Sequence, residues 1–209
     1  MAARSVEDRL RDEYFGLLPD IQRAGERLET EIRYHLREIS GQLNEFERVV
    51  VKSRVKECES AISKLRHGQQ GAVFDPDRPE DYRLQNLNDL AGVRVLAFPR
   101  RLVTEIDGTL RNLFPEWTSD PVLDDRSEVL AFKYHGYSKA NVVVSCEYQV
   151  VSMLTGLFWE VEHAAIYKPA PRFRGAALSP RVQEHSANVL LALREFEEVF
   201  EDAVSSSSQ

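Results

Sequence analysis

The stretch RVKECESAISK, residues 54–64, carries cationic and hydroxyl side chains at spacings that suit phosphate binding. If it begins as a strand, Arg54 and Lys56 share one face, because side chains alternate along a strand. If the chain then turns helical, Lys56, Ser60 and Lys64 lie along one stripe. Arginine binds phosphate as a bidentate fork and lysine as a point charge. The same pattern also fits a solvent-exposed helix face, so this segment alone leaves both interpretations open.

Two acidic residues occur where strands are expected, and together they suit a divalent cation. Asp89 comes just before the apolar segment GVRVLAF, and Glu147 lies in CEYQ, after a run of valines. Mg²⁺ takes few protein oxygens and shares phosphate oxygens with its nucleotide, so two carboxylates from neighbouring strands make a workable site. By itself Asp89 is more typical of a turn or a helix cap. A lone carboxylate among valines is costly to bury, which favours a function for Glu147.

Two further segments carry candidate side chains. In KYHGYSKAN, residues 133–141, a glycine between His135 and Tyr137 suits a turn that exposes the tyrosine. An exposed tyrosine beside a basic residue can stack on a purine, although a plain hairpin turn explains the segment equally well. In FWEVEHAAIYK, Glu162 and His163 form either a pair that supports a site or two surface residues.

Composition limits the class of protein. The chain has 209 residues, of which 43% are hydrophobic and 29% charged, as in a soluble globular protein. Its net charge of -7 means that a polyanion must bind at a local basic patch. Cys58 and Cys146 lie far apart, which argues for a reducing compartment and against a disulfide scaffold or a zinc site. Apolar runs are too short for a bilayer and no signal peptide is recognisable, so we expect a cytoplasmic protein without membrane association.

The elements that must position these residues alternate along the chain. Apolar residues recur at helical spacing over 5–46, where Pro19 predicts a break, and β-branched segments predict strands near 46–53 and 92–98. Two strands around a turn are expected within 128–152. Further helices are expected at 56–67, 100–114, 153–168 and 180–203. This alternation predicts an α/β or α+β domain flanked by helices at both ends.

In their order along the chain, RVKECESAISK, NDLAGVRV, KYHGY, CEYQ and FWEVEHAAIYK resemble the motifs of the RelA/SpoT family, the (p)ppGpp synthetases. The flanking helices resemble those of the small, single-domain alarmone synthetases. The resemblance implies an α/β (α+β) fold whose mixed sheet is similar to that of the polymerase β type of nucleotidyltransferase. The expected organisation is N-terminal helices at 1–45, a synthetase core at 46–168, a C-terminal linker and helix at 169–204, and a disordered serine-rich tail at 205–209.

The resemblance also implies a reaction. In this family the β,γ-pyrophosphate of ATP moves to the 3′-hydroxyl of GDP or GTP, AMP is released, and Mg²⁺ is the cofactor. Asp89 and Glu147 would be the catalytic pair that holds Mg²⁺, with Glu147 also the base or orienter for the 3′-hydroxyl. ATP and its phosphates would be held by Arg54, Lys56, Ser60 and Lys64. The acceptor side would consist of Tyr137, stacked on guanine, with Lys133, Gln149 and Asn141, and Arg94 and His163 would support the site.

The acceptor side departs from the family pattern. The family commonly reads Gly-Tyr-Arg-Ser-x-His, whereas GYSKAN places Ser138 at the arginine position and Asn141 at the histidine position. Val151 and Ser152 stand where arginine and threonine are common. A lost charged contact to phosphate costs about 1.5–3 kcal/mol. The acceptor is therefore open between GDP or GTP and the 3′ end of tRNA, which toxic relatives modify, and a non-catalytic nucleotide-binding relative is the third alternative.

The resemblance bears on partners as well. Small relatives are often tetramers built through terminal helices, and the apolar residues of the last predicted helix provide surface for a homo-oligomer or for packing on the chain's own domain. An antitoxin partner is compatible with the resemblance, but no feature of the sequence indicates one.

Overall fold

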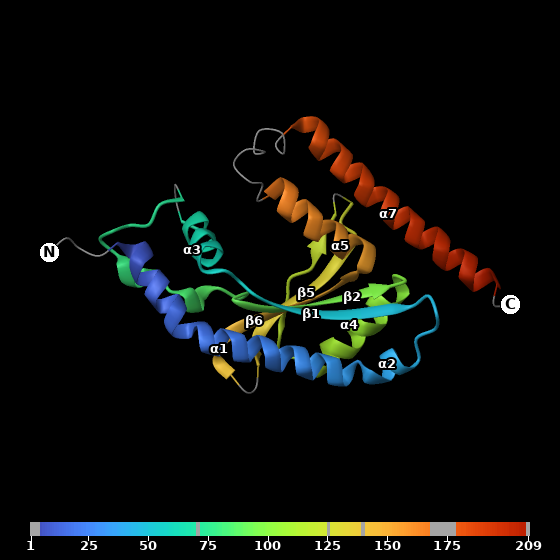
Figure 1. The fold of residues 1–209 in the computed structure, drawn as a ribbon, viewed down its shortest axis with the longest axis horizontal. Helices are drawn as coiled ribbons and strands as arrows, with labels where there is room; N and C mark the ends of the chain where they lie inside the picture. The colour runs from blue at the N-terminus through green and yellow to red at the C-terminus, as the bar shows by residue number, and fades with distance from the viewer. Residues whose placement is uncertain (1–4, 70–71, 125, 139–140, 168–178, 208–209) are drawn as a thin grey trace.

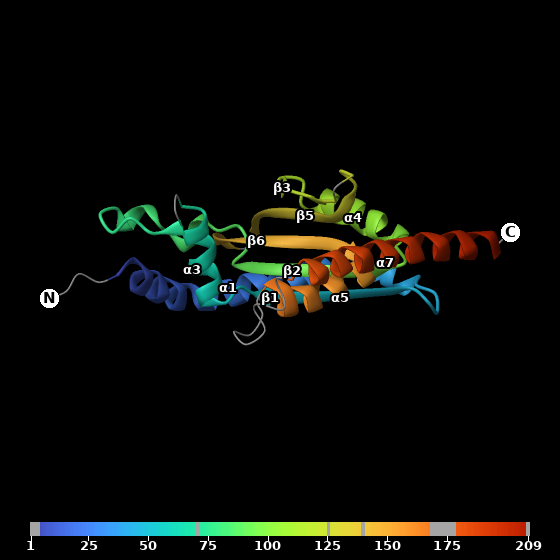
Figure 2. The same cartoon turned by 90° about the horizontal axis from the view of Figure 1, so that it is seen from above.

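A mixed six-stranded sheet forms the centre of the computed structural model, which describes residues 5–69, 72–124, 126–138, 141–167 and 179–207. The strands follow the order β1-β2-β6-β5-β3, and β4 also pairs with β5. Figure 2 shows β5, β6, β2 and β1 side by side in this order. Strands β2 and β6 are parallel, and the other pairs are antiparallel. Their bounds are β1 Arg48–Val55, β2 Ala91–Phe98, β3 Thr118–Ser119, β4 Val122–Leu123, β5 Val129–Ser138 and β6 Asn141–Ser152. The predicted fold class is confirmed.

One face of the sheet is apolar and carries the main core. Helices α1 (Val6–His35) and α4 (Arg101–Leu113) lie against this face, below the strands in Figure 1. Because side chains alternate along a strand, the residues of β2 that enter this core, such as Val93 and Val95, lie two positions apart. The core joins side chains of α1 and α4 to those of the strands, among them Leu28, Ile32, Ile106, Leu110, Val93, Val95, Tyr148 and Val150.

The opposite face is apolar at one end only. Leu96, Ala131 and Val151 form a small cluster there, against Met153 and Trp159 of α5 (Met153–Glu162). Helix α7 (Pro180–Ser207) packs on α5, and both lie above the strands in Figure 1. The chain leaves α5 through the π-helical turn η4 (His163–Tyr167). Helix α3 (Cys58–His67) lies at the other end of the sheet, and short 3-10 turns η2 (Pro79–Asp81) and η3 (Leu84–Asn86) precede β2. This arrangement leaves polar side chains on the rest of the face.

Helix α1 does not break at Pro19, so the predicted break is wrong. Tyr14 before the proline and Ile21 after it are both buried in the same core. We infer that packing on the sheet outweighs the backbone hydrogen bond that a proline inside a helix removes. The chain leaves α1 at Leu36 instead, and a short helix α2 (Arg37–Gly41) follows.

At the C-terminus α7 extends to Ser207, into the segment that was predicted as a disordered tail. The hydroxyl of Ser206 donates a hydrogen bond to the carbonyl of Asp202, one turn earlier. The predicted linker lies almost entirely outside the described residues, and the predicted domain limits stay predictions. In the described part of the chain, no helix is both long and apolar enough to cross a membrane.

The contact between α5 and the sheet yields a test of stability. A Cβ atom on Gly156 would clash with Cδ2 of Leu96 and would lie 3.0 Å from Cγ1 of Val151, and both neighbours are buried. Gly156→Ala is therefore expected to lower the free energy of unfolding by about 1–3 kcal/mol. Gly16→Ala in α1, where nothing lies within 4 Å, is the control and should be neutral or stabilising. Equal midpoints of urea unfolding for the two variants would contradict this packing.

Candidate active site

Asp89 is held between two lysines at the end of the sheet next to α3. The Nζ atoms of Lys56 and Lys64 each lie 2.9 Å from Oδ2 of Asp89. Lys64 comes from α3, and Ser60 lies one turn before it on the same helix. Lys56 precedes α3, which begins at Cys58, so the predicted helical stripe that starts at Lys56 is wrong. The two lysines nevertheless meet at one carboxylate.

The backbone of Lys56 is fixed from two sides. Its N–H donates to the carbonyl of Leu90 at 2.9 Å, which continues the pairing of β1 with β2. Its own carbonyl accepts a hydrogen bond from the hydroxyl of Tyr14 in α1 at 2.8 Å. Lys56 is therefore placed beside Asp89 by long-range contacts, which explains why helical spacing alone misplaces it.

Asp89 is buried, yet its environment favours the charged form. Burial acts to raise the pKa of Asp89, but the hydrogen bonds and charges of Lys64 and Lys56 outweigh it and hold the pKa below its usual value. Its second oxygen, Oδ1, is buried and has no hydrogen-bond partner among the described residues. An unpaired, ionised oxygen is costly in such a place, and a carboxylate oxygen is a ligand that hard divalent cations prefer.

The second predicted acid, Glu147, belongs to a chain of polar contacts on the face of the sheet opposite the main core. Arg94 donates from Nε to Oε1 of Gln149 at 3.1 Å, and Gln149 donates from Nε2 to Oε1 of Glu147 at 2.7 Å. The guanidinium of Arg54 lies 3.7 Å from the same Glu147 oxygen. Burial and the nearby charge of Arg54 lower the pKa of Arg94. The sheet thus brings together four predicted residues from three strands.

The strand register places Glu147 in the middle of a row across the sheet. Arg54 of β1 faces Gly92 of β2, Gly92 faces Glu147 of β6, and Glu147 faces His135 of β5. Gly92 leaves room for the side chain of Arg54, whose Nε would lie 3.6 Å from a Cβ atom at that position. A bulky residue at Gly92 would push Arg54 away from the carboxylate.

A cavity of about 670 Å³ lies beside Tyr137, at the other end of the row. Tyr137 is 51% exposed, as predicted. Trp117 packs so closely on Gly136 that a Cβ atom there would lie 2.7 Å from the indole Cγ. The walls of this cavity include Asn86, Asn88, Trp117, Thr118, His135 and Tyr137.

Two other residues that were predicted on the acceptor side, Lys133 and Asn141, lie on β5 and β6, the strands next to this cavity. Lys133, opposite Gln149, forms an ion pair of 2.5 Å with Asp120, which lies between β3 and β4. The hydrogen bond of Lys133 lowers the pKa of Asp120, with smaller contributions from the charges of Lys133, His135 and Lys64. Asn141 opens β6 opposite Ser138, but its side chain is outside the described part of the structure.

A second cavity, of about 890 Å³, lies on the side of Arg54. Arg94 and Gln149 line it from the sheet, and His163 lines it from the turn after α5. Gln149, predicted on the acceptor side, therefore lies in the wall of the cavity next to Arg54. The two cavities thus involve opposite ends of the row that contains Glu147.

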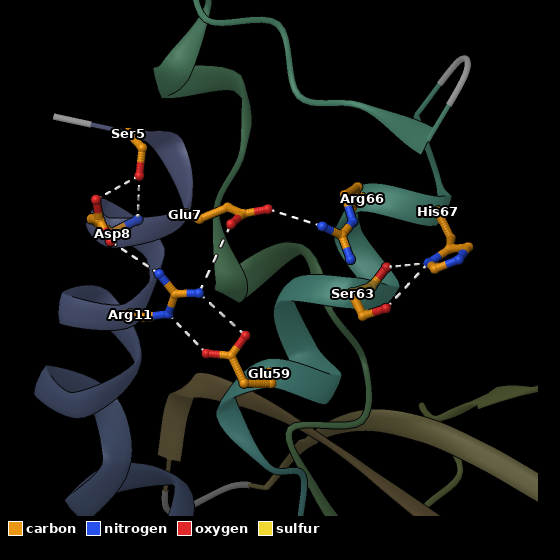
Figure 3. A network of polar contacts seen from close by, with 8 residues as sticks. All are labelled: Ser5, Glu7, Asp8, Arg11, Glu59, Ser63, Arg66 and His67. Carbon is orange, nitrogen blue, oxygen red and sulfur yellow. Dashed lines mark hydrogen bonds and ion pairs between the residues drawn. The ribbon is translucent and has the colours of Figure 1, made fainter. Parts of the chain in front are cut away.

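Ion pairs tie α3, which carries Lys64, to the start of α1 (Figure 3). Arg11 contacts Glu59 of α3 at 2.8 Å and Asp8 of its own helix at 2.9 Å. Arg66 of α3 contacts Glu7 at 2.9 Å. These pairs are exposed and each contributes little stability, but together they fix the position of α3 relative to α1.

The motifs of the sequence did not indicate five of these residues as candidates: His135, Asp120, Trp117, Asn86 and Asn88. His135 alone had a local signal, because it lies two positions from Tyr137 and therefore on the same face of one strand. The others are brought to the site by loops whose course the sequence does not specify.

The chain has the fold of the small alarmone synthetases, a mixed α/β architecture of the nucleotidyltransferase type. The sequence itself matches no protein-family model and no curated protein.

Three solved structures illustrate the likeness. Small alarmone synthetase 1 from Bacillus subtilis bound to its product pppGpp has a TM-score of 0.69 at 15% identity, over 95% of this chain and 100% of that chain. The same synthetase bound to AMPCPP has a TM-score of 0.65 at 16% identity, over 92% and 96% of the two chains. A GTP pyrophosphokinase family protein from Streptococcus pneumoniae has a TM-score of 0.61 at 17% identity, over 93% and 96%.

Proposed function

We propose that this protein is an ATP-dependent pyrophosphotransferase, which moves the β,γ-pyrophosphate of ATP to the 3′-hydroxyl of GDP or GTP and releases AMP. The observation that carries the proposal is the row in which Glu147 lies between Arg54 and His135, with one cavity on each side. Structures of the same fold hold AMPCPP in one case and pppGpp in another, which supports two nucleotide sites.

The donor, ATP, occupies the side of Arg54. Its base lies in the larger cavity, where the planar guanidinium groups of Arg54 and Arg94 can stack on a purine. Its phosphates extend toward Lys56 and Lys64. Arg54 and Lys56 are two strand residues apart, which separates their backbones by roughly 6.6 Å. One nucleotide can therefore place its base beside Arg54 and its phosphates beside Lys56. Phosphates arriving there would also compensate the positive charge around Asp89.

The proposed transfer uses Mg²⁺ as its cofactor. Asp89, through its unpaired Oδ1, and Glu147 would hold the ion. When bound, Mg²⁺ neutralises phosphate charge that develops during the transfer. A carboxylate pair with cationic neighbours fits this task, because a bound triphosphate supplies further oxygen ligands.

Glu147 accepts or orients the proton of the attacking 3′-hydroxyl. Among the described residues both polar contacts of Glu147 fall on Oε1, so Oε2 remains for the acceptor. Gln149 fixes the carboxylate, and the transfer then depends on placing the hydroxyl in line with the β-phosphorus of ATP.

The acceptor occupies the cavity beside Tyr137, with its guanine stacked on the tyrosine. Tyr137→Ala is expected to raise the KM for GDP or GTP by about 5- to 150-fold, because stacking of a base on an aromatic ring contributes roughly 1–3 kcal/mol. Tyr137→Phe keeps the ring and should leave the KM near the original value. Steady-state kinetics at saturating ATP measure both variants. An unchanged acceptor KM in the alanine variant would remove Tyr137 from the site.

One assay tests the proposed function. Purified protein, Mg²⁺ and γ-labelled ATP are combined with GDP, GTP or deacylated tRNA, and the labelled products are separated. Label on GDP or GTP is the expected result. Label on tRNA alone would replace the proposed acceptor, and the altered GYSKAN segment makes this arm necessary. No transfer to any acceptor, with AMPCPP still bound, would indicate a non-catalytic nucleotide-binding protein.

A further inference from the structure

The larger cavity is walled by the C-terminal helix as well as by the sheet and α5. Arg54, Arg94 and Gln149 line it from the strands, and Trp159 lines it from α5. On the remaining side α7 contributes Gln183, Ser186, Ala187 and Leu190. These four residues lie at positions i, i+3, i+4 and i+7, so one face of α7 is turned to the cavity along about two turns. No family motif described above includes any of them.

Polar contacts between Ser186 and Glu201 hold α7 in this position. Ser186 donates a hydrogen bond to Glu162 at the end of α5. Arg194 pairs with Asp124 and with Glu128, next to β5. Glu197, whose side chain is fully buried, accepts the hydroxyl of Ser152, with both of its oxygens 2.6 Å from it. Near its end, Glu201 accepts a hydrogen bond of 2.5 Å from the backbone N–H of Arg101. A helix fixed at four points can serve as a wall of a binding site.

We infer that α7 forms the outer wall of the donor-base pocket and that Gln183 binds the edge of the adenine. The inference rests on the proposed function, which places the donor base between Arg54 and Arg94. A purine stacked on guanidinium planes still presents its polar edge, and Gln183 and Ser186 are the polar side chains that α7 contributes to the cavity. Ser186 already donates its hydroxyl hydrogen to Glu162, which leaves Gln183 for the base. A glutamine amide carries one acceptor and two donors, which matches the adjacent donor and acceptor of an adenine edge.

A large side chain introduced on α7 tests whether this helix forms a wall of the donor-base pocket. Ala187→Trp places a large side chain in the cavity and is expected to weaken AMPCPP binding at least tenfold, measured by calorimetry without any acceptor. Asn188→Trp is the matched control, since Asn188 is the neighbouring exposed residue and does not line the cavity. The control should bind AMPCPP as the original protein does. Equal affinities for the two tryptophan variants would overturn the assignment of α7 to the donor site.

A change in the preference between ATP and GTP as pyrophosphate donor tests whether Gln183 binds the base. A carboxylate only accepts hydrogen bonds, so Gln183→Glu loses one partner on adenine but can accept both donors on the edge of guanine. We expect the ratio of kcat/KM for ATP over GTP as pyrophosphate donor to fall at least tenfold. The KM for the acceptor GDP should stay unchanged. A general disturbance of the fold would change this KM as well. An unchanged donor ratio would exclude Gln183 as the residue that binds the base.

The two proposals fail in different ways. If the protein binds AMPCPP but transfers nothing, the proposed function is wrong, and the calorimetric comparison of Ala187→Trp with Asn188→Trp still decides the role of α7. If transfer occurs and neither Ala187→Trp nor Gln183→Glu alters donor binding or choice, the proposed function stands and the inference about α7 is wrong. Circular dichroism and thermal unfolding of each variant establish that it is folded.

Discussion

Glu147→Gln is expected to reduce the rate of pyrophosphate transfer by about 10²–10⁴-fold, while AMPCPP, measured without Mg²⁺, binds with unchanged affinity. Glutamine has the same shape and keeps an oxygen that can accept the 2.7 Å hydrogen bond from Gln149. It cannot take up a proton from the acceptor hydroxyl, and loss of a general base has an effect of this size. Single-turnover transfer of labelled ATP, together with calorimetry, measures the two quantities separately.

The control for this variant is an acid outside the site. Asp20 is on the surface of α1 and pairs with Arg23 at 2.9 Å, so Asp20→Asn should leave both transfer and binding unchanged. Undiminished turnover in Glu147→Gln would remove Glu147 from its assigned role. A parallel loss of AMPCPP affinity would assign Glu147 to donor binding instead of to activation of the acceptor.

Asp89→Asn is expected to lower transfer by at least about a hundredfold and to raise the Mg²⁺ concentration needed for half-maximal rate. The amide is a weaker ligand for Mg²⁺ than a carboxylate, and it leaves the ammonium groups of Lys56 and Lys64 without their counter-charge. A Mg²⁺ titration of the initial rate measures the effect. Transfer with the original Mg²⁺ dependence would show that Asp89 does not hold the cation.

The stability of Asp89→Asn should also depend on pH differently from that of the original protein. Because the folded protein holds the pKa of Asp89 below its usual value, the carboxylate stabilises the fold at pH values above that usual value, near 4. This contribution is lost as the pH falls through the folded pKa. The original protein should therefore exceed Asp89→Asn in stability at pH 7, and the difference should shrink at pH 3. Asp20→Asn, the surface control described above, should leave the transfer rate unchanged.

Much of the site could be predicted because it depends on strand alternation. Glu147 and Gln149 were assigned to one face of a strand from their spacing, and the structure joins them by a hydrogen bond. Lys64 and Asp89 were assigned to one site only through a family resemblance, since the distance between them along the chain carries no local signal. Their ion pair forms because α3 lies at the end of the sheet where Asp89 precedes β2.

Other features could not be predicted because distant packing decides them. Pro19 predicts the end of a helix by its local chemistry, and only the core around Tyr14 and Ile21 reverses that preference. The wall that α7 provides to the larger cavity is a similar case. Gln183 looks like an ordinary surface residue of an amphipathic helix until Arg194 and Glu197 fix that helix beside α5.

Strand β6 also limits how this chain can change in length. Tyr148 and Val150 belong to the main core, whereas Glu147 and Gln149, the residues next to them, belong to the site on the opposite face. Removing or adding one residue within β6 would move the aromatic side chain to the polar face and the carboxylate into the core. Substitutions can therefore adjust the acceptor or the donor one side chain at a time, but an insertion or deletion inside this strand would destroy the fold and the activity in the same step.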